Sequence, residues 1–305
     1  MKRDFLSLQD LSGKEILDLI ELTEKLKTNK AHAKGRLEGK TVGLVFQKPS
    51  NRTRVSFDVG IRQLGGNCIY LGPDEINLGV RESTSDVAKT LSRYLDCIVA
   101  RTHTHEDLLD LAKYATIPVI NGLSDLSHPC QGLTDLFSVY EKFKKLEGLT
   151  FVYIGDGNNV CHSLMLGCSK VGMHMNIATP KGYEPSAKIM EWTLANAKKS
   201  GAKIKLDNDP KAAVKGADVI YSDVWVSMGQ EAEGETRKEI FKGFQINSEL
   251  VKGAHDNFIF MHCLPAHRGE EVTADVIDGE HSIVFDQAEN RLHTQKAVLI
   301  TYLGN

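Results

Sequence analysis

The segment SNRTR (residues 50–54) combines side chains that bind phosphate groups, and it follows a short apolar run, TVGLV (41–45). Ser50 and Thr53 supply hydroxyl groups and Arg52 supplies a guanidinium group, so several hydrogen-bond donors lie within about one helical turn. A helix that begins near Ser50 adds free backbone N–H groups and the positive end of its dipole. The segment therefore predicts a site for a phosphate dianion, although a capped, solvated basic helix start has the same composition.

Three further places in the chain carry side chains with catalytic potential. HPCQ (128–131) places an imidazole and a carboxamide around a proline, HCLPAHRG (262–269) contains a second histidine and a thiol, and Arg101 follows another apolar run. A single histidine is more often a hydrogen-bonded structural residue than a catalyst. Because all of these segments follow predicted strands, we interpret them together with SNRTR as parts of one site.

The elements that must position these segments are strands and helices in alternation. The apolar runs are rich in Val, Ile and aromatic residues and are mostly apolar throughout, which is typical of parallel strands covered on both faces. The predicted strands are 41–46, 67–71, 96–100, 117–121, 150–155, 174–179, 218–223, 257–263 and 282–286. The predicted helices are 13–28, 83–95, 105–115, 132–146, 159–171, 185–200 and 287–301. The stretch 52–64 is ambiguous because its apolar residues alternate, as they would in a strand.

This alternation predicts an α/β protein with two doubly wound domains, each with a mostly parallel sheet flanked by helices. A chain of 305 residues exceeds the size at which one hydrophobic core usually keeps growing. We expect the domains to be 1–141 and 142–305, with the boundary at the helix predicted over 132–146. Ligands of open α/β sheets bind at the carboxyl ends of the strands, so we expect the active site in the cleft between the domains.

Composition indicates the kind of ligand and the compartment. The chain has 37 Lys and Arg against 40 Asp and Glu, so its positive charge is local and its target should be small. The sequence has no run of eighteen apolar residues and no apolar stretch typical of a signal peptide. Six scattered cysteines without a CxxC pair favour free thiols in a reducing compartment. We therefore expect a cytoplasmic protein, or a mature organellar protein whose targeting peptide has been removed.

Four motifs, SNRTR, HPCQ, DVWVSMGQE (223–231) and HCLPAHRG, occur in this order along the chain. Together they resemble ornithine carbamoyltransferases within the aspartate/ornithine carbamoyltransferase superfamily. The first two motifs recur across the superfamily, whereas the SMG loop and the thiol of HCLP are typical of the ornithine-specific members. The resemblance implies a carbamoyl-phosphate domain, an ornithine domain, and transfer of a carbamoyl group to the δ-amine of ornithine. The products would be citrulline and phosphate, and no metal or organic cofactor is implied.

The resemblance also implies roles for individual residues. Carbamoyl phosphate would be bound by Ser50, Asn51, Arg52, Thr53, Arg101, His128, Gln131, Arg291 and the main-chain carbonyl of Cys263 or Leu264. Ornithine would be bound by Asn159, Asp223, Ser227 and Met228. The C-terminal helix near Arg291 would return toward the first domain. Catalysis would depend on Cys263, Arg101 and His128. Arg101, His128 and Thr53 would donate to the carbonyl oxygen as it gains negative charge.

The acceptor chemistry adds a further requirement. A primary amine has a free pKa near roughly 10, so it must lose a proton before it attacks a carbonyl carbon. Cys263 and Asp223, which both follow strands predicted in the second half, are candidates for favouring that loss. We interpret Asp223 as the anchor for the charged amine of the amino acid. Cys263 would accept a proton from the attacking amine or orient it.

One segment departs from the superfamily pattern. EINLGVRES (75–83) corresponds to a loop that enters the neighbouring subunit's active site with a longer polar side chain, and this chain has Asn77 at that position. The resemblance implies that Asn77 reaches carbamoyl phosphate and that the protein is a homotrimer or a multiple of trimers. A plain surface loop is the alternative for this segment. The direction of the pathway, arginine synthesis or degradation, does not follow from the sequence.

Other functions explain fewer motifs. IGDGNN (154–159) follows a predicted strand, but a dinucleotide-binding G-x-G-x-x-G would need glycine where Val160 stands. A docking patch for an acidic partner or nucleic acid would leave the other motifs unexplained. The nearest alternative is a carbamoyltransferase for another amine. The residues that a zinc hydrolase could use, which show no standard ligand spacing, are His103, His105, His262, Cys263 and His267.

Overall fold

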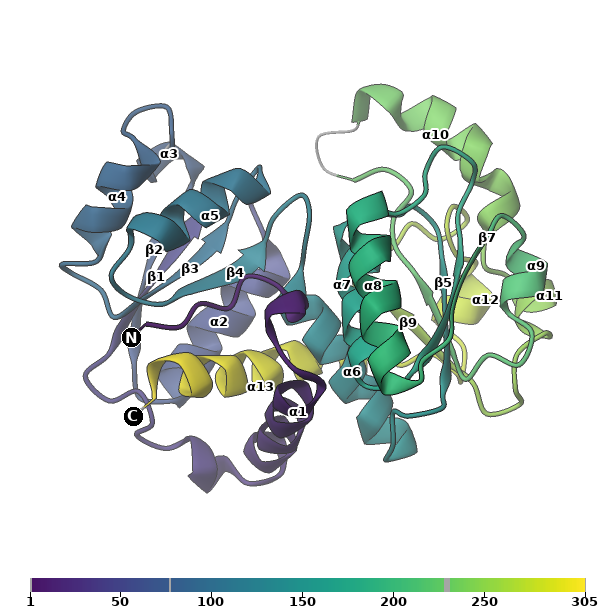
Figure 1. Cartoon of the computed structure of the whole chain (residues 1–305), viewed down its shortest axis with the longest axis horizontal. Helices are drawn as coiled ribbons and strands as arrows, with labels where there is room; N and C mark the ends of the chain where they lie inside the picture. Colours follow the sequence, from purple (N-terminus) through teal and green to yellow (C-terminus); the bar gives the residue numbers. More distant parts are fainter. Residues whose placement is uncertain (1, 77, 228–230, 305) are drawn as a thin grey trace. The chain divides into compact units, whose positions relative to one another are not determined.

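The computed structural model describes residues 2–76, 78–227 and 231–304, and the contacts divide the chain into two units. Unit 1 contains the chain up to Phe137 and again from Glu289 onward, and unit 2 is Ser138–Ala288. The chain leaves unit 1 within helix α6 (Pro129–Phe143) and re-enters it within helix α13 (Val284–Leu303). Each unit has a parallel sheet of its own (Figure 1).

The sheet of unit 1 has the strand order β2-β1-β3-β4, and all of its neighbouring strands are parallel. Its central strands are almost entirely buried, whereas the edge strand β2 alternates exposed and half-buried residues. Parallel neighbours need crossover connections, which the helices provide. The strands are β1 (Thr41–Phe46), β2 (Asn67–Leu71), β3 (Cys97–Arg101) and β4 (Val119–Leu123). The helices between them are α2 (Asn51–Gln63), α3 (Pro73–Ile76), α4 (Thr84–Leu91) and α5 (His105–Tyr114).

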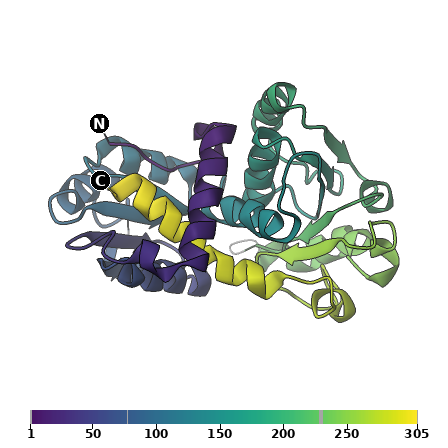
Figure 2. The same cartoon turned by 90° about the horizontal axis from the view of Figure 1, so that it is seen from below.

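Apolar side chains on the strands and helices hold unit 1 together. Ile98 and Ala100 of β3 share one core cluster with Val87 of α4 and with Leu108 and Leu111 of α5. Each fully buried aliphatic side chain contributes about 1.5–3 kcal/mol relative to an exposed one. Helix α1 (Gly13–Thr28) begins with a capping box, and it lies beside α13 in both views (Figures 1 and 2). Lys27 of α1 donates to Asn290 of α13 at 2.8 Å.

The sheet of unit 2 has the strand order β7-β6-β5-β8-β9 and is also parallel. Helices α7 and α8 cover one face, and α9, α11 and α12 lie on the other (Figure 1). The strands are β5 (Thr150–Ile154), β6 (His174–Ala178), β7 (Ile204–Asp207), β8 (Val219–Ser222) and β9 (Ile259–His262). The helices are α7 (Asn159–Lys170), α8 (Ala187–Ser200), α9 (Pro210–Ala213), α10 (Gly234–Phe241), α11 (Ser248–Val251) and α12 (Ala274–Ile277).

The predicted fold class is confirmed, since two α/β units each contain a parallel sheet flanked by helices. The ambiguous stretch 52–64 is the helix α2. The strand predicted over 282–286 is wrong, because α13 begins at Val284 and only Ser282 forms a bridge to Phe260 of β9. The edge strand β7 was not predicted. In the part of the chain that the structure describes, no helix is both long and apolar enough to cross a membrane.

Candidate active site

The first part of the site lies where β1 leads into α2. Ser50 is the N-cap of α2, and its hydroxyl oxygen accepts the Thr53 backbone N–H at 3.3 Å. A hydroxyl that accepts one hydrogen bond still has its own proton to donate, so this cap leaves a donor for a ligand. The end of β1 is joined to the end of β3, because the Gln47 N–H donates to the Arg101 carbonyl at 2.8 Å. Asn51 begins the helix and is exposed.

Three buried residues from α2, α6 and α13 meet in unit 1. Arg291 donates through Nη1 to Gln131 Oε1 at 2.5 Å and through Nη2 to Thr53 Oγ1 at 3.1 Å. Gln131 in turn donates to Asp135 Oδ1 at 2.7 Å. These hydrogen bonds fix the orientation of the three side chains. Predicted phosphate ligands that are far apart in the sequence therefore lie together.

Positive charge is concentrated around these residues. Arg101, at the end of β3, is buried, and burial together with the charges of Arg291 and Arg52 lowers its pKa to about 10. Among the described residues, Arg101 Nε has no hydrogen-bond partner. Guanidinium groups that repel one another in a buried place are destabilising unless an anion joins them. The arrangement is suited to binding a doubly charged anion.

His128 lies in the same electrostatic environment as these arginines. Burial, followed by the charges of Arg291, Arg101 and Arg52, holds the pKa of His128 well below its usual range. Its imidazole is therefore neutral at physiological pH, and one ring nitrogen carries a proton. A neutral imidazole can donate a hydrogen bond to a carbonyl oxygen without adding to the local positive charge.

The first part of the site in unit 2 is the loop between β5 and α7. Asn158 caps α7, because its Oδ1 accepts the N–H groups of Val160 at 3.0 Å and Cys161 at 3.1 Å. Its Nδ2 donates to Asp223 Oδ2 at 2.8 Å. Asn159, the predicted ornithine ligand, is the first residue of α7. Gly157 lies so close to the Pro185 backbone that a Cβ atom would overlap it, which explains this glycine without a bound dinucleotide.

Asp223 and Cys263 meet at the carboxyl ends of two neighbouring strands, β8 and β9. The Cys263 thiol donates to Asp223 Oδ1 at 2.9 Å, and the Val224 N–H donates to the same oxygen at 2.8 Å. Sequence-distant residues predicted to serve the acceptor amine are thus in direct contact.

The backbone after Cys263 is held in an uncommon conformation. Leu264 has a φ of 57°, in the left-handed region that residues other than glycine rarely adopt. Its N–H donates to His262 Nδ1 at 2.9 Å, and His262 Nε2 lies 3.3 Å from Glu271 Oε1. The His262 and Glu271 side chains are fully buried. These contacts fix the main chain at the position predicted to hold the carbamoyl nitrogen.

Two further residues near the predicted acceptor site were not predicted from the sequence. Arg237 of α10 is buried, donates to Asp156 after β5, and also donates to the Trp225 carbonyl at 2.6 Å. Burial raises the pKa of Asp156 in spite of this arginine. The pair links α10 to the loop that carries Ser227, which is half-buried. Asp156 lies in the IGDGNN motif, but nothing in the sequence distinguishes Arg237 from other helical arginines.

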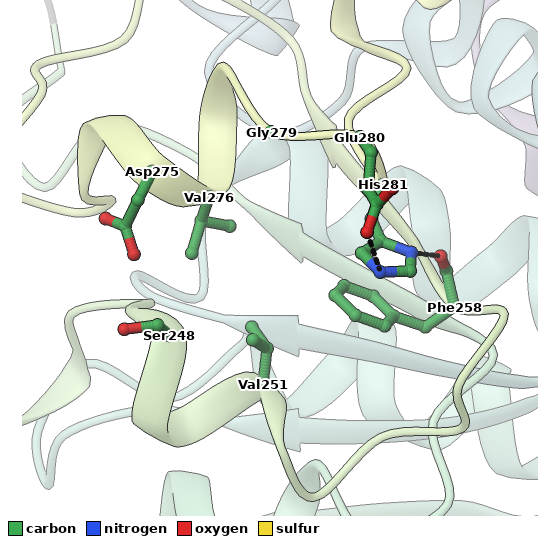
Figure 3. Close-up of a pocket in the computed structure, with 8 residues that line it drawn as sticks. All are labelled: Ser248, Val251, Phe258, Asp275, Val276, Gly279, Glu280 and His281. Atoms are coloured by element: carbon green, nitrogen blue, oxygen red, sulfur yellow. Dashed lines mark hydrogen bonds and ion pairs between the residues drawn. The ribbon is translucent and has the colours of Figure 1, made fainter.

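The described residues therefore form two groups of predicted ligands, one in each unit. Asn77 and Met228 lie outside the described residues. A separate cavity in unit 2 has a wall in which the Phe258 and His281 rings stack with their centroids 4.3 Å apart (Figure 3). None of the predicted site residues lines that cavity.

Comparisons with known proteins match both halves of the chain. The family model described as aspartate/ornithine carbamoyltransferase, carbamoyl-P binding domain, matches residues 3–141. The model described as aspartate/ornithine carbamoyltransferase, Asp/Orn binding domain, matches residues 147–302. Together these two models cover most of the chain.

Individual relatives agree with these models. An ornithine carbamoyltransferase of Thermococcus kodakarensis is 56% identical over 304 residues, which cover 99% of this chain and 96% of the relative. An anabolic ornithine carbamoyltransferase of Pyrococcus furiosus is 54% identical over 99% of this chain and 96% of the relative.

Solved structures give the same result. The ornithine carbamoyltransferase from Pyrococcus furiosus matches with a TM-score of 0.96 at 54% identity, over 99% of this chain and 97% of that chain. The ornithine transcarbamoylase from Giardia lamblia matches with a TM-score of 0.92 at 35% identity, over 99% and 98%. The chain belongs to the aspartate/ornithine carbamoyltransferase family, and within it to the ornithine carbamoyltransferases.

Proposed function

We propose that this chain transfers the carbamoyl group of carbamoyl phosphate directly to the δ-amine of L-ornithine, giving L-citrulline and phosphate. Residues 1–141 would form the carbamoyl-phosphate domain, and residues 142–305 would form the ornithine domain, with the helix near Arg291 returning to serve the first substrate. The observation that supports this proposal most strongly is the buried cationic group around Arg101, since its lowered pKa reflects an unfavourable charge that a phosphate dianion would offset.

The carbamoyl-phosphate side would work as follows. The phosphate would accept hydrogen bonds from Ser50, Asn51, Arg52, Thr53 and Arg291. Arg101 and neutral His128 would donate to the carbonyl oxygen, where negative charge gathers as the carbon becomes tetrahedral. Gln131 and the carbonyl of Cys263 or Leu264 would hold the carbamoyl NH₂. The hydrogen bonds of Arg291 to Thr53 and Gln131 support this assignment, because they align these groups before the substrate binds.

Ornithine would be bound by the predicted ligand residues of unit 2. Asp223 would bind the α-ammonium, Asn159 the α-carboxylate, and Ser227 and Met228 the same end of the amino acid. The Cys263 thiol, which touches Asp223, would lie beside the attacking amine and orient it. The segment 223–235 contains no Lys or Arg, which an enzyme for aspartate would need for a second carboxylate.

The transfer itself forms one bond and breaks one bond. The neutral δ-amine attacks the carbamoyl carbon, a C–N bond forms, and the C–O bond to phosphate breaks as the phosphate leaves with the electron pair. The proton lost by the nitrogen passes to the Asp223–Cys263 pair or to the leaving phosphate. Since each need is met by a group of the chain, we propose no covalent carbamoyl-cysteine, no metal and no organic cofactor in the reaction path. Trapping a stoichiometric carbamoyl-enzyme without acceptor would overturn direct transfer.

A citrulline assay with carbamoyl phosphate and a panel of amines tests reaction and acceptor together. Ornithine should be used far better than putrescine, aspartate or lysine, because only ornithine offers both α-groups and the right reach. Treatment with a chelator should leave the rate unchanged. Equal use of putrescine would contradict the roles of Asn159 and Asp223, and the absence of any carbamoylated product would contradict the whole proposal.

The proposal also covers the assembly of the protein, its compartment and its pathway. The resemblance supports a homotrimer or a multiple of trimers, in which Asn77 reaches a neighbouring site, and sedimentation velocity of the purified chain tests the assembly. The six free cysteines support a cytoplasmic or other reducing compartment. The anabolic relative from Pyrococcus furiosus supports a place in arginine biosynthesis. We propose no nucleic-acid or membrane partner, and the substrates are the only ligands of the reaction.

A further inference from the structure

The loop after β9 carries a histidine and two carboxylates whose possible ligand atoms all lie within 4.8 Å of one another. His267 Nδ1 is 4.0 Å from Glu270 Oε2 and 3.9 Å from Glu271 Oε2. Gly269, between them, has a φ of 92°, which allows the tight turn that brings positions 267 and 271 together. We refer to His267, Glu270 and Glu271 as the 267–271 cluster.

Glu271 is the unusual member of the 267–271 cluster because its side chain is completely buried. Its Oε1 accepts the His267 backbone N–H at 2.6 Å and lies 3.3 Å from His262 Nε2. Its Oε2 is buried and has no hydrogen-bond partner within residues 2–76, 78–227 and 231–304. A buried carboxylate oxygen without a donor is unfavourable. This oxygen lies 3.9 Å from His267 Nδ1, and a cation bound between the two atoms would satisfy it.

Nearby cations leave the cluster negative. Lys238 of α10 lies 3.0 Å from Glu270 Oε1, which leaves Glu270 Oε2 for another ligand. Arg268 is directed to Asp278, to which it donates two hydrogen bonds of 2.8 and 2.6 Å. Two carboxylates and one imidazole thus face one another with one lysine at their edge.

We propose that the 267–271 cluster binds a divalent metal ion of the zinc class through His267 Nδ1, Glu270 Oε2 and Glu271 Oε2. An imidazole with two carboxylates is a ligand set that zinc accepts, whereas magnesium and calcium prefer oxygen ligands alone. Zinc bonds of about 2.0–2.2 Å require the ligand atoms to lie about 3.3–3.6 Å apart in a tetrahedron. The side chains of His267 and Glu270 are 52% and 30% exposed, so they have room to rotate. Small rotations toward the buried Glu271 would bring the three ligand atoms to the separation that zinc requires. The fourth position would be open to water.

The proposed ion has no part in carbamoyl transfer, and the site stands independently of the proposed function. It does share Glu271 with His262, whose Nδ1 accepts the Leu264 N–H. A metal ion on Oε2 leaves Oε1 in place, so it would stabilise the present conformation of the loop. Binding to the folded state alone raises thermal stability.

Calorimetric titration of the chelator-treated protein with zinc chloride tests the site. Because the Cys263 thiol could also bind zinc, the titration is carried out in the Cys263→Ser variant. We expect one zinc ion per chain, a rise in melting temperature, and a loss of affinity of about tenfold or more when His267→Gln is added. His255→Gln, which changes another exposed histidine of unit 2, is the matched control and should bind as before.

The visible spectrum of bound cobalt(II) tests the ligands directly, because it depends on the atoms that coordinate the metal. Cobalt(II) bound to the Cys263→Ser variant should show the visible bands of a site with nitrogen and oxygen ligands. Glu270→Gln should weaken these bands, and it avoids disturbing the buried Glu271. Absence of zinc binding in Cys263→Ser, or unchanged affinity after His267→Gln, would overturn the proposal. Citrulline formation by the wild-type protein reports on the proposed function separately.

Discussion

The arginines of the proposed phosphate site are unfavourable to one another in the absence of a ligand. Arg52 and Arg291 both lower the pKa of Arg101, and all three lower that of His128. A protein that only needed stability would not gather these charges in a buried place. The arrangement is consistent with selection for binding a dianion. We therefore expect the loss of a single arginine charge to weaken that binding strongly.

Arg52→Leu tests this view at the residue scale. We expect the variant to fold normally and to lose about 100-fold or more in kcat/KM for carbamoyl phosphate, because a charge-assisted bond to the phosphate in a buried site contributes more than one at the surface. Arg62→Leu is the control on the same helix, since Arg62 is exposed and pairs with Asp58 at 2.5 Å. Nearly normal kinetics of Arg52→Leu, measured as initial rates of citrulline formation, would refute the role of Arg52 in phosphate binding.

His128 should make the fold sensitive to acid. Its pKa is held well below 6.5 in the folded protein, so the unfolded chain takes up a proton first as the pH falls. The free energy of unfolding contributed by this residue is therefore complete above pH 6.5 and decreases below it, by up to about 1.4 kcal/mol per pH unit. Urea unfolding at pH 7.5 and 5.5 should show a smaller decrease for His128→Gln than for the wild type. An equal decrease in both proteins would show that His128 is protonated in the native state.

The residues of the motifs could be predicted from the sequence, but the side chains that form hydrogen bonds with them could not. SNRTR, HPCQ and HCLP each have a recognisable composition, and the structure brings Thr53, Gln131 and Arg291 into contact. Arg237 is different, because burial and its contact with Asp156 result from tertiary packing that no local pattern encodes. The role of Asn158 as the cap of α7 was not predicted, although a helix cap is a signal that the sequence does carry.

At the scale of elements, the cap of α7 and the proposed acceptor site share one side chain, Asn158. Asn158→Ala removes both the cap and the donor to Asp223, so we expect a loss of about 1 kcal/mol in stability and a higher KM for ornithine. Asn158→Ser keeps a capping oxygen but not the amide donor. It should restore the stability measured by urea unfolding without restoring the KM. If both variants had the wild-type KM, the contact with Asp223 would have no part in ornithine binding.

The strands that were predicted well are those buried on both faces, because β1, β3, β5, β8 and β9 read as continuous apolar runs. The edge strand β7, with the sequence IKLD, has too few apolar residues to stand out. The run SIVFD failed for the opposite reason. Its composition fits a strand, but from Val284 onward it forms the first turn of the long helix α13. Periodicity cannot separate a short buried strand from the first turn of a buried helix.

At the scale of the whole molecule, each unit has its own sheet, its own core and its own group of predicted ligand residues. The reaction, however, requires that the acceptor nitrogen come within bonding distance of the carbamoyl carbon. In the proposed reaction, the cationic form of ornithine would therefore lie close to the phosphate dianion in the ternary complex, and close to Arg52, Arg101 and Arg291 when the dianion is absent. Unit charges 4 Å apart interact by about 4 kcal/mol at an effective dielectric constant of 20. Charge alone thus favours binding of carbamoyl phosphate before ornithine.

We accordingly predict that a non-hydrolysable phosphonate analogue of carbamoyl phosphate increases the affinity for ornithine. A coupling free energy of about 1–3 kcal/mol would correspond to a factor of about 5–150. Isothermal titration of ornithine into the wild-type protein, with and without saturating analogue, measures that factor, and linkage requires ornithine to raise the affinity for the analogue by the same factor. Asp223→Asn should weaken ornithine binding in both titrations. The affinity for the analogue itself should stay nearly unchanged, because Asp223 is one of the residues proposed to bind ornithine. Equal ornithine affinity with and without the analogue would mean that the two groups of ligand residues act independently, and the order of binding would then have to be set by something other than charge.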